Sequence, residues 1–266
     1  MPTLGIYTNC QGGAVNDVFL SKMPFFSDWN VIYMLNYQMI RDNLSLNEGD
    51  LQKCDVFLFQ PVSENHGVYS TLNEDGILGM LRPDCLRISF PSLYLDAWPI
   101  YEDGGYYYGA EDIIRYKDLG HTLEDILKMY QENALSFNLK QRFEDSLAYL
   151  SSRENDCTIK TLSNYIRENS KTELLFDTQN HPIPKLLYFL SEEICKVIKD
   201  HYQIEFSSIV DYDPNALQEY GHYEHSKYMN SELGMDYITY DHYEYYSELI
   251  THTFMNPEIT KTRVYL

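Results

Sequence analysis

The stretch Asn9-Cys10-Gln11-Gly12-Gly13 places a thiol between two amides, directly after a short apolar run and directly before two glycines. A strand that turns into a helix exposes the side chain at the turn, as the serine of many hydrolases shows. A cysteine there lies at a helix N-terminus, which lowers the thiol pKa and favours the nucleophilic thiolate. Asn9, Gln11 and the N–H groups near Gly12 can then stabilise an oxyanion. The alternative is a small buried cysteine in an ordinary turn.

A second candidate for chemistry is the stretch from Asp177 to Pro182, which reads DTQNHP. Proline holds the preceding His181 in extended backbone, at the entrance of the helix that follows. We predict that His181 is a general base and that Asp177 orients its imidazole. The alternative is that Asn180 or Asp177 merely caps this helix.

Strands and helices alternate in the first third of the chain, which predicts a parallel sheet covered on both faces. The expected strands are 3–8, 30–36, 55–62 and 85–91, and the expected helices between them include 13–23 and 70–81. Ligands of such sheets bind at the carboxyl ends of the strands. Three of these ends carry the polar or kinked groups Asn9-Cys10-Gln11, Gln60-Pro61 and Phe90-Pro91-Ser92. His66 follows one of these strands closely, and we expect it at the same edge.

The remainder of the chain is predicted to be mostly helical. Apolar residues recur at helical spacing in 122–150, 158–168 and 183–199. The segment 201–250 is rich in tyrosine, histidine and acids, and its aromatic content favours an ordered structure that serves packing or a partner surface. The predicted fold is therefore α/β, with a parallel-sheet N-terminal half that has helices on both faces, followed by a mostly helical half.

The composition excludes several classes of function. The 266 residues carry a formal charge of −20, which opposes non-specific binding to nucleic acids or anionic membranes. An anionic ligand would need a local basic pocket. No window is apolar enough to span a membrane, and no secretory signal is recognisable. Five cysteines without a C-x-x-C pair indicate reduced thiols in a cytoplasmic protein.

A metal site is not predicted from the histidines of the C-terminal segment. His222 and His225 lie near Glu224, but a clear third ligand is missing from the sequence. The pair Arg153-Glu154, taken alone, is typical of a surface salt bridge. The N-terminal turn also lacks a P-loop pattern, so phosphoryl transfer is not supported.

Taken in order, the motifs resemble those of the WcbI family of polysaccharide biosynthesis proteins, which are linked to capsule formation. The resemblance rests on the N-C-Q turn, the strand ending in Gln60, the I-x-F-P-x-L-Y segment from Ile88 to Tyr94 with Pro99 after it, Arg153-Glu154 and the N-H-P motif at 180–182. It implies a WcbI-like α/β domain over residues 1–200. Residues 201–266 would form a Tyr- and acid-rich extension packed on the same domain.

The resemblance implies a coenzyme A-dependent acetyltransferase that modifies a hydroxyl of a capsular or other surface polysaccharide sugar. It also suggests a distant likeness to the SGNH/GDSL hydrolases, with Cys10 at the nucleophile position and His181 and Asp177 in the late motif. Gly12, Gln60, His66 and Asn180 join Asn9 and Gln11 as the expected oxyanion or substrate groups. The expected contacts to acetyl-CoA are Arg153, Arg82, Arg87, Arg115, Pro91 and Tyr94.

Two other readings stay open at this point. The first is a cysteine-based esterase or deacylase on the same scaffold, with water as the acceptor. The second is a non-catalytic binding protein that uses the tyrosine-rich segment. In either case we expect a protein without a metal and without a nucleic-acid partner, and a homo-oligomer is compatible with the sequence.

Overall fold

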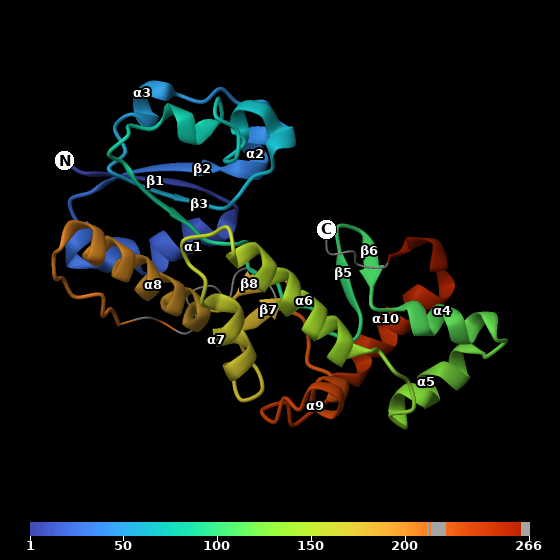
Figure 1. Ribbon diagram of the computed structural model, residues 1–266. Coiled ribbons are helices and arrows are strands. Elements are labelled where there is room, and N and C mark those ends of the chain that lie inside the picture. The colour runs from blue at the N-terminus through green and yellow to red at the C-terminus, as the bar shows by residue number, and fades with distance from the viewer. Residues whose placement is uncertain (212, 214–221, 262–266) are drawn as a thin grey trace. The chain divides into compact units, whose positions relative to one another are not determined.

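The computed structural model describes residues 1–211, 213 and 222–261 (Figure 1). The chain forms two compact units. Unit 1 comprises Met1–Leu93, Leu150–Asn164 and the described residues of 181–220. Unit 2 comprises Tyr94–Tyr149, Tyr165–Asn180 and the described residues of 221–266. The units are defined by packing, and the division of the family domain from an extension at residue 200 stays a prediction.

Unit 1 is built on a four-stranded parallel sheet, as predicted. Its order is β2 (Asn30–Leu35), β1 (Thr3–Thr8), β3 (Val56–Phe59) and β4 (Leu86–Ser89). Ile6 of β1 pairs with Tyr33 on one side and Leu58 on the other. Every residue of β1 and β3 is buried, which explains why these strands read as continuous apolar runs.

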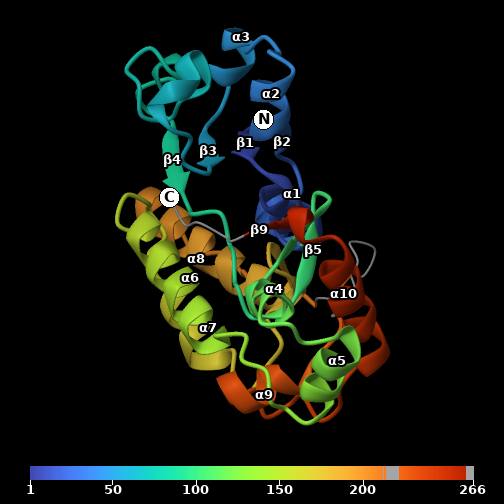
Figure 2. The same cartoon turned by 90° about the vertical axis from the view of Figure 1, so that its right-hand side faces the viewer.

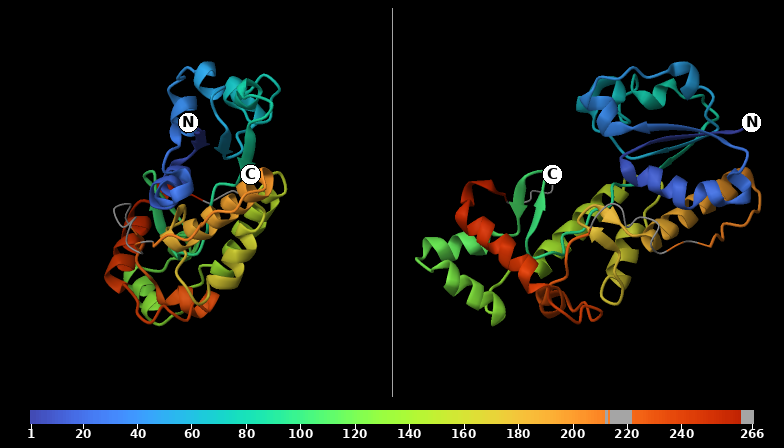
Figure 3. Two further views of the ribbon diagram at one scale, coloured as in Figure 1. Left: turned by 90° about the vertical axis from the view of Figure 1, so that its left-hand side faces the viewer. Right: turned by 180° about the vertical axis from the view of Figure 1, so that it is seen from behind.

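Helices cover both faces of this sheet, which confirms the predicted layering (Figure 1). One face carries α2 (Asn36–Arg41) and α3 (Glu48–Leu51). The other carries α1 (Cys10–Val18) and α8 (Pro184–Tyr202), which lie side by side (Figure 3). Phe19, after α1, contacts the ring of Tyr188 in α8 with 5.5 Å between ring centroids.

The strand order 2-1-3-4 defines where a ligand is expected. From β1 the chain moves to β2 on one side, and from β2 it crosses back to β3 on the other side. The carboxyl ends of β1 and β3 therefore form the topological switch point, the usual ligand-binding place of open parallel sheets. Asn9 follows β1 and Gln60 follows β3, so both residues lie at this point.

The predicted helix at 70–81 is wrong apart from a short 3-10 turn at Ile77–Met80. The Ser70 hydroxyl accepts hydrogen bonds from the N–H groups of Leu72 and Asn73, at 2.9 and 3.2 Å. Such local bonds compete with a helical ladder. Gly76 also lies against the main-chain carbonyl of Ser70, where a side chain would clash.

Unit 2 contains most of the helical half. Its helices are α4 (Glu111–Asp118), α5 (Leu123–Gln131), α9 (Lys227–Leu233) and α10 (Tyr243–Met255), and it shares α6 (Leu139–Glu154) and α7 (Leu162–Asn169) with unit 1. Within it, α10 packs against α4 and α5 (Figure 2). The segments 122–150, 158–168 and 183–199 are thus helical as predicted, the first as the pair α5 and α6.

A small sheet in unit 2 was not predicted. It joins β5 (Tyr101–Asp103), β6 (Tyr106–Tyr108) and β9 (Thr260–Lys261), with β6 and β9 parallel. The remaining strand pieces are β7 (Phe176–Thr178) and β8 (His181–Pro182). The remaining 3-10 turns are Leu20–Lys22, Pro24–Phe26, Glu64–Tyr69 and Pro257–Ile259. None of the helices in the described part of the chain is long and apolar enough to cross a membrane.

The tyrosine-rich segment contributes core to unit 2. Tyr228 and Tyr246 are fully buried and pack against Tyr130 of α5, with ring centroids 5.1 and 5.9 Å away. This packing agrees with the ordered structure predicted from the aromatic content. Tyr212 and Tyr220, also in that segment, lie outside the described residues.

Unit 2 contains a largely buried ion pair. Arg142 of α6 pairs with Asp96 at 2.5 Å, and it also donates to the carbonyl oxygens of Trp98 and Pro99 at 2.9 and 3.0 Å. The Asp96 side chain is 2% exposed. The carboxylate, despite opposition from burial, raises the pKa of Arg142, so the guanidinium stays charged.

Candidate functional site

The N-terminal turn forms because Asn9 caps α1. Its Oδ1 accepts a hydrogen bond from the N–H of Gln11 at 2.9 Å, and Cys10 is the first helical residue. A side chain in place of Gly12 would overlap Thr8, and one in place of Gly13 would overlap the Tyr33 hydroxyl. The glycines therefore permit close packing around the half-buried Cys10.

Buried amides join the ends of β1 and β3. Gln60 accepts a hydrogen bond from the N–H of Asn9 at 2.8 Å and donates through Nε2 to Oε1 of Gln11 at 3.1 Å. Both glutamines are 2% exposed. The structure thus brings Asn9, Gln11 and Gln60 together, as their positions at strand ends predicted.

The segment after β4 completes this group. The Gln11 side chain donates to the carbonyl of Leu93 at 2.8 Å and accepts from the Leu93 N–H at 2.9 Å. Asn9 donates through Nδ2 to the hydroxyl of Ser92 at 3.0 Å. We call Asn9, Cys10, Gln11, Gln60 and Ser92 the strand-end cluster. The described hydrogen bonds of its two glutamine amides are made to other protein groups.

Tyr33 is a neighbour of the cluster that the sequence did not reveal. Its hydroxyl donates to the carbonyl of Asn9 at 3.4 Å and accepts from the N–H of Gly13. Tyr33 follows α1 in the sequence, and the parallel register of β1 and β2, which pairs it with Ile6, places it near the turn. The side chain is 43% exposed, so it reaches solvent beside Cys10.

The ionisation of Cys10 differs from the prediction. Burial raises the pKa of the Cys10 thiol, and the N–H groups of Cys10 and Gln11 oppose this only in part. Burial and the nearby Cys10 raise the pKa of Tyr33 to about 12. The helix N-terminus therefore does not produce a resting thiolate, and both groups carry their protons at neutral pH.

Cys10 opens α1, and β8 with His181 comes directly before α8, the helix beside α1. Phe19 meets Tyr188, and Met23 meets Cys195 at 3.5 Å between sulfurs, so the two segments run parallel. The approach of His181 to Cys10 stays a prediction. His181 is half-buried in β8.

The alternative reading, in which Asn180 or Asp177 caps α8, is wrong. The helix begins at Pro184 with Ile183 as its N-cap, and no side chain makes the capping bond. Asn180 accepts instead from the hydroxyl of Thr178 at 3.2 Å. In unit 2, the main-chain carbonyl of Asp177 accepts from the N–H of Tyr223 at 2.8 Å. Orientation of His181 by Asp177 stays a prediction.

Arg153, one of the expected cofactor ligands, lies at the strand ends. Its guanidinium contacts the carbonyl of Pro61, next to Gln60, at 3.4 Å. The prediction of a surface salt bridge with Glu154 is wrong, because Glu154 is 3% exposed and accepts from the N–H and hydroxyl of Ser163. Glu154 thereby satisfies donors in the first turn of α7.

The other three arginines lie elsewhere. Arg82 pairs with Asp55 at 2.9 Å, at the amino end of β3 and so at the opposite edge of the sheet. Arg87 is an exposed residue near the amino end of β4. Arg115 belongs to unit 2 and pairs with Asp112 at 3.0 Å. The structure therefore gives Arg82 and Arg87 no place in the strand-end cluster.

Three further expected residues are placed as follows. Pro91 is buried directly after β4 in unit 1. Tyr94 belongs to unit 2, where its hydroxyl lies 2.8 Å from that of Tyr101. His66 lies in the exposed turn Glu64–Tyr69, and the described bonds of the strand-end cluster do not include it.

The histidines of the C-terminal segment gather around Glu224 in a way the spacing did not predict. The Glu224 carboxylate lies 3.3 Å from Nε2 of His222 and 3.0 Å from Nε2 of His242. Neither of these two contacts involves His225. Within the described ranges, no three His, Cys, Asp or Glu side chains are arranged to hold a metal ion.

Comparisons with known proteins cover nearly the whole chain. Residues 3–199 match the family described as polysaccharide biosynthesis enzyme WcbI. A comparison with curated proteins finds no match. Among solved structures, the chain is similar to one of WcbI, described as a novel polysaccharide biosynthesis enzyme in native form without a disulfide bond between coenzyme A and a cysteine. The identity is 16% and the TM-score 0.59, over 97% of this chain and 96% of that chain.

Proposed function

Because the chain belongs to the WcbI family of polysaccharide biosynthesis enzymes, we propose that it transfers an acyl group from coenzyme A to a sugar hydroxyl. The acetyl group is the proposed cargo, and the acceptor is a sugar of a capsular or other surface polysaccharide. The observation that carries the proposal is a half-buried thiol, Cys10, at the switch point of the parallel sheet.

The similar solved structure supports coenzyme A as the ligand. Its description is of a native form without a disulfide bond between coenzyme A and a cysteine, and it thus names the cofactor together with a protein thiol. In unit 1, Cys10 is half-buried, whereas the other four cysteines are buried. Cys10 is therefore the residue proposed to meet the thiol end of coenzyme A.

Arg153 is proposed to bind a phosphate of the cofactor. It lies beside Pro61 at the carboxyl end of β3, on the same edge of the sheet as Cys10. A protein with a formal charge of −20 repels an anionic cofactor at long range, so local cations must bind it. Arg82, by contrast, lies at the opposite edge of the sheet, beside Asp55.

His181 is proposed as the general base. It accepts the proton of the sugar hydroxyl while the hydroxyl oxygen forms a bond to the thioester carbon. The carbon–sulfur bond then breaks, its electron pair leaves with the cofactor sulfur, and the imidazolium returns the proton to that sulfur. Main-chain N–H groups near Gly12 are proposed to stabilise the oxyanion.

Cys10 fits a role in lining the site better than a role as nucleophile. Burial raises the pKa of its thiol, so little thiolate is present at neutral pH. Gln11 and Gln60 bond to protein groups and are proposed to hold the turn. The five free thiols fit the reducing conditions of the cytoplasm, where we propose that the enzyme acts.

Transfer of labelled acetyl groups to a panel of sugar acceptors tests this function, with ligand binding measured in parallel by calorimetry. His181→Ala should keep coenzyme A binding and lower transfer by at least a hundredfold, since general-base catalysis contributes about that much. The matched control is His201→Ala, an exposed histidine near the end of α8, which should leave both values unchanged.

Other outcomes would point to the competing functions. Hydrolysis of simple esters that depends on Cys10, without coenzyme A binding, would support a cysteine esterase or deacylase. Coenzyme A binding without transfer to any acceptor and without ester hydrolysis would support a non-catalytic binding protein, provided that His181→Ala leaves coenzyme A binding unchanged.

A further inference from the structure

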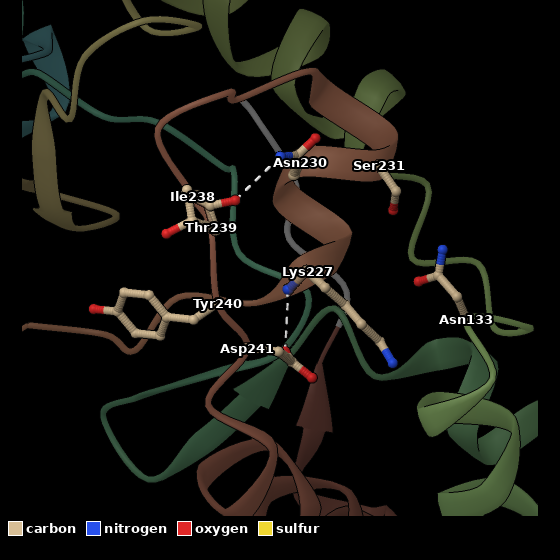
Figure 4. A pocket seen from close by; sticks show the side chains of 8 residues that line it. All are labelled: Asn133, Lys227, Asn230, Ser231, Ile238, Thr239, Tyr240 and Asp241. Atoms are coloured by element: carbon tan, nitrogen blue, oxygen red, sulfur yellow. Dashed lines mark hydrogen bonds between the residues drawn. The ribbon is translucent and has the colours of Figure 1, made fainter.

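Unit 2 contains an open cavity of about 530 Å³ that the proposed acyl transfer does not use (Figure 4). It lies between α9, the loop that follows α5, and the segment that returns after α9. Its polar lining includes Asn133, Asn230, Ser231, Thr239, Tyr240 and Asp241. The volume falls in the range of about 300–1,000 Å³ that small-molecule sites occupy.

Hydrogen bonds fix both walls of this cavity. The Asn230 side chain donates to the carbonyl of Ile238 at 3.1 Å, which ties the returning segment to α9 (Figure 4). Ile238 itself is 2% exposed and anchors that segment in the core. The N–H of Lys227 donates to Oδ1 of Asp241 at 3.1 Å, which ties the other end. The cavity is therefore a preformed feature of the fold.

Asp241 is held in place from beneath. Its Oδ1 also accepts from the hydroxyl of the buried Tyr130 at 2.8 Å, and that hydroxyl lies 2.8 Å from the hydroxyl of Ser226. The Lys227 ammonium donates to the carbonyl of Gln131 at 2.8 Å and lies 5.0 Å from the Tyr130 ring. Lys227 is thus occupied by protein groups, and the cavity offers little to bind a phosphate.

The lining chemistry suits a saccharide. Sugar hydroxyls both donate and accept hydrogen bonds, and the amides, hydroxyls and carboxylate here supply both functions. Tyr240 lines the cavity and is 57% exposed, and its ring meets the His242 ring at 4.7 Å between centroids. The part of the ring that stays exposed can stack on the apolar face of a sugar. The cavity is open to solvent, which leaves room for a chain to continue.

The neighbouring hollow determines which saccharides are compatible. It has a volume of about 610 Å³, shares Asp241 with the cavity, and is lined by three further carboxylates, those of Glu224, Glu244 and Glu248. His242 also lines the hollow, 3.0 Å from the Glu224 carboxylate, so carboxylates outnumber the groups that can carry a positive charge there. Such an excess repels an anionic sugar chain and attracts an ammonium group, and the net charge of −20 acts in the same direction.

We propose that this cavity of unit 2, with the adjoining acidic hollow, binds an oligosaccharide of neutral or amino sugars and excludes acidic ones. The site goes beyond the proposed acyl transfer. It needs neither coenzyme A nor Cys10, so it can be present even if the transfer reaction is not.

Calorimetry of the full chain without coenzyme A tests the site, with chitosan pentasaccharide, chitopentaose and a galacturonic acid pentasaccharide as probes. We expect the first two to bind, the amino sugar more tightly at low salt than at high salt. The acidic probe should bind at least tenfold more weakly. Cys10→Ala should leave these affinities unchanged, which separates this site from the proposed acyl-transfer site.

Tyr240→Ala should weaken both accepted probes about tenfold, as the loss of one aromatic stacking contact does. Thr239→Val, an exposed and nearly isosteric change, should weaken them less. The matched control Tyr106→Ala removes a tyrosine that is 43% exposed on β6, and it should change nothing. Equal binding of the acidic probe, no binding of any probe, or full affinity in Tyr240→Ala would each overturn the proposal.

Discussion

Replacement of Gln11 by alanine tests whether the amides of the strand-end cluster hold the fold together. The Gln11 side chain makes three described hydrogen bonds, two with Leu93 and one with Gln60. Each such bond contributes about 1 kcal/mol, and the partners left behind are buried. The sum predicts that Gln11→Ala lowers the free energy of unfolding by about 3 kcal/mol.

Urea denaturation followed by far-UV circular dichroism measures this change, and the midpoint should fall while the slope stays constant. The matched control is Gln38→Ala, a partly exposed glutamine whose amide makes one long contact of 3.4 Å to Tyr37. It should change stability by less than about 0.5 kcal/mol. An equally small effect of Gln11→Ala would refute the positioning role and leave its amide available for catalysis.

Three further predictions concern other groups. Burial raises the pKa of Cys10, so iodoacetamide should alkylate it more slowly at pH 8 than it alkylates free cysteine. The rate should still increase with pH above the ordinary thiol pKa of about 8.5. A rate that levels off below pH 7 would contradict the raised pKa. Asp96→Ala should lower the free energy of unfolding by about 3–5 kcal/mol, because the charge of Arg142 would lose its partner. Thermal unfolding measures this loss against the control Asp84→Ala, which removes an exposed aspartate. Equal losses of stability in the two variants would count against a stabilising ion pair. Glu154→Gln should lower stability by about 1–2 kcal/mol, because a charge-assisted bond to Ser163 becomes a neutral one; chemical denaturation would show no change if the carboxylate were unimportant.

The parts of the fold that were predicted from sequence depend on local patterns. The strands 3–8 and 55–62 are nearly continuous apolar runs, which only a sheet buried on both faces requires. Once the strands are known, parallel pairing brings Asn9 and Gln60 to one edge without further information. The start of α1 at Cys10 also follows from local chemistry, since Asn9 is a good N-cap.

The errors concern contacts between residues far apart in the chain. The sheet of unit 2 pairs Tyr107 with Thr260, and no local pattern announces such a pairing. Glu154 binds Ser163 in place of its neighbour Arg153, because the first turn of α7 presents donors that need a partner. Tyr33 reaches Cys10 only through the register of β1 and β2.

The cluster also shows why roles are harder to predict than positions. Gln11 and Gln60 were expected at the strand ends and lie there, but their amides bond to protein groups. A sequence gives the same residue types for a catalytic amide and for a positioning one. The direction of the thiol pKa is equally hard to predict from the sequence. Burial outweighs the two N–H groups at the helix N-terminus, and burial depends on how the whole unit packs.

Thermal unfolding with coenzyme A and with acetyl-CoA is the measurement that tests the central claim most directly. A ligand at about 100 times its dissociation constant should stabilise the native state by about 2.7 kcal/mol, which raises Tm by several degrees. Arg153→Ala should reduce the shift, whereas Arg167→Ala, which removes an exposed arginine paired with Glu144, should keep it. A shift of this size for the parent chain and for Arg167→Ala is the predicted result. No shift with either ligand at millimolar concentration would contradict coenzyme A binding and the acyl transfer built on it.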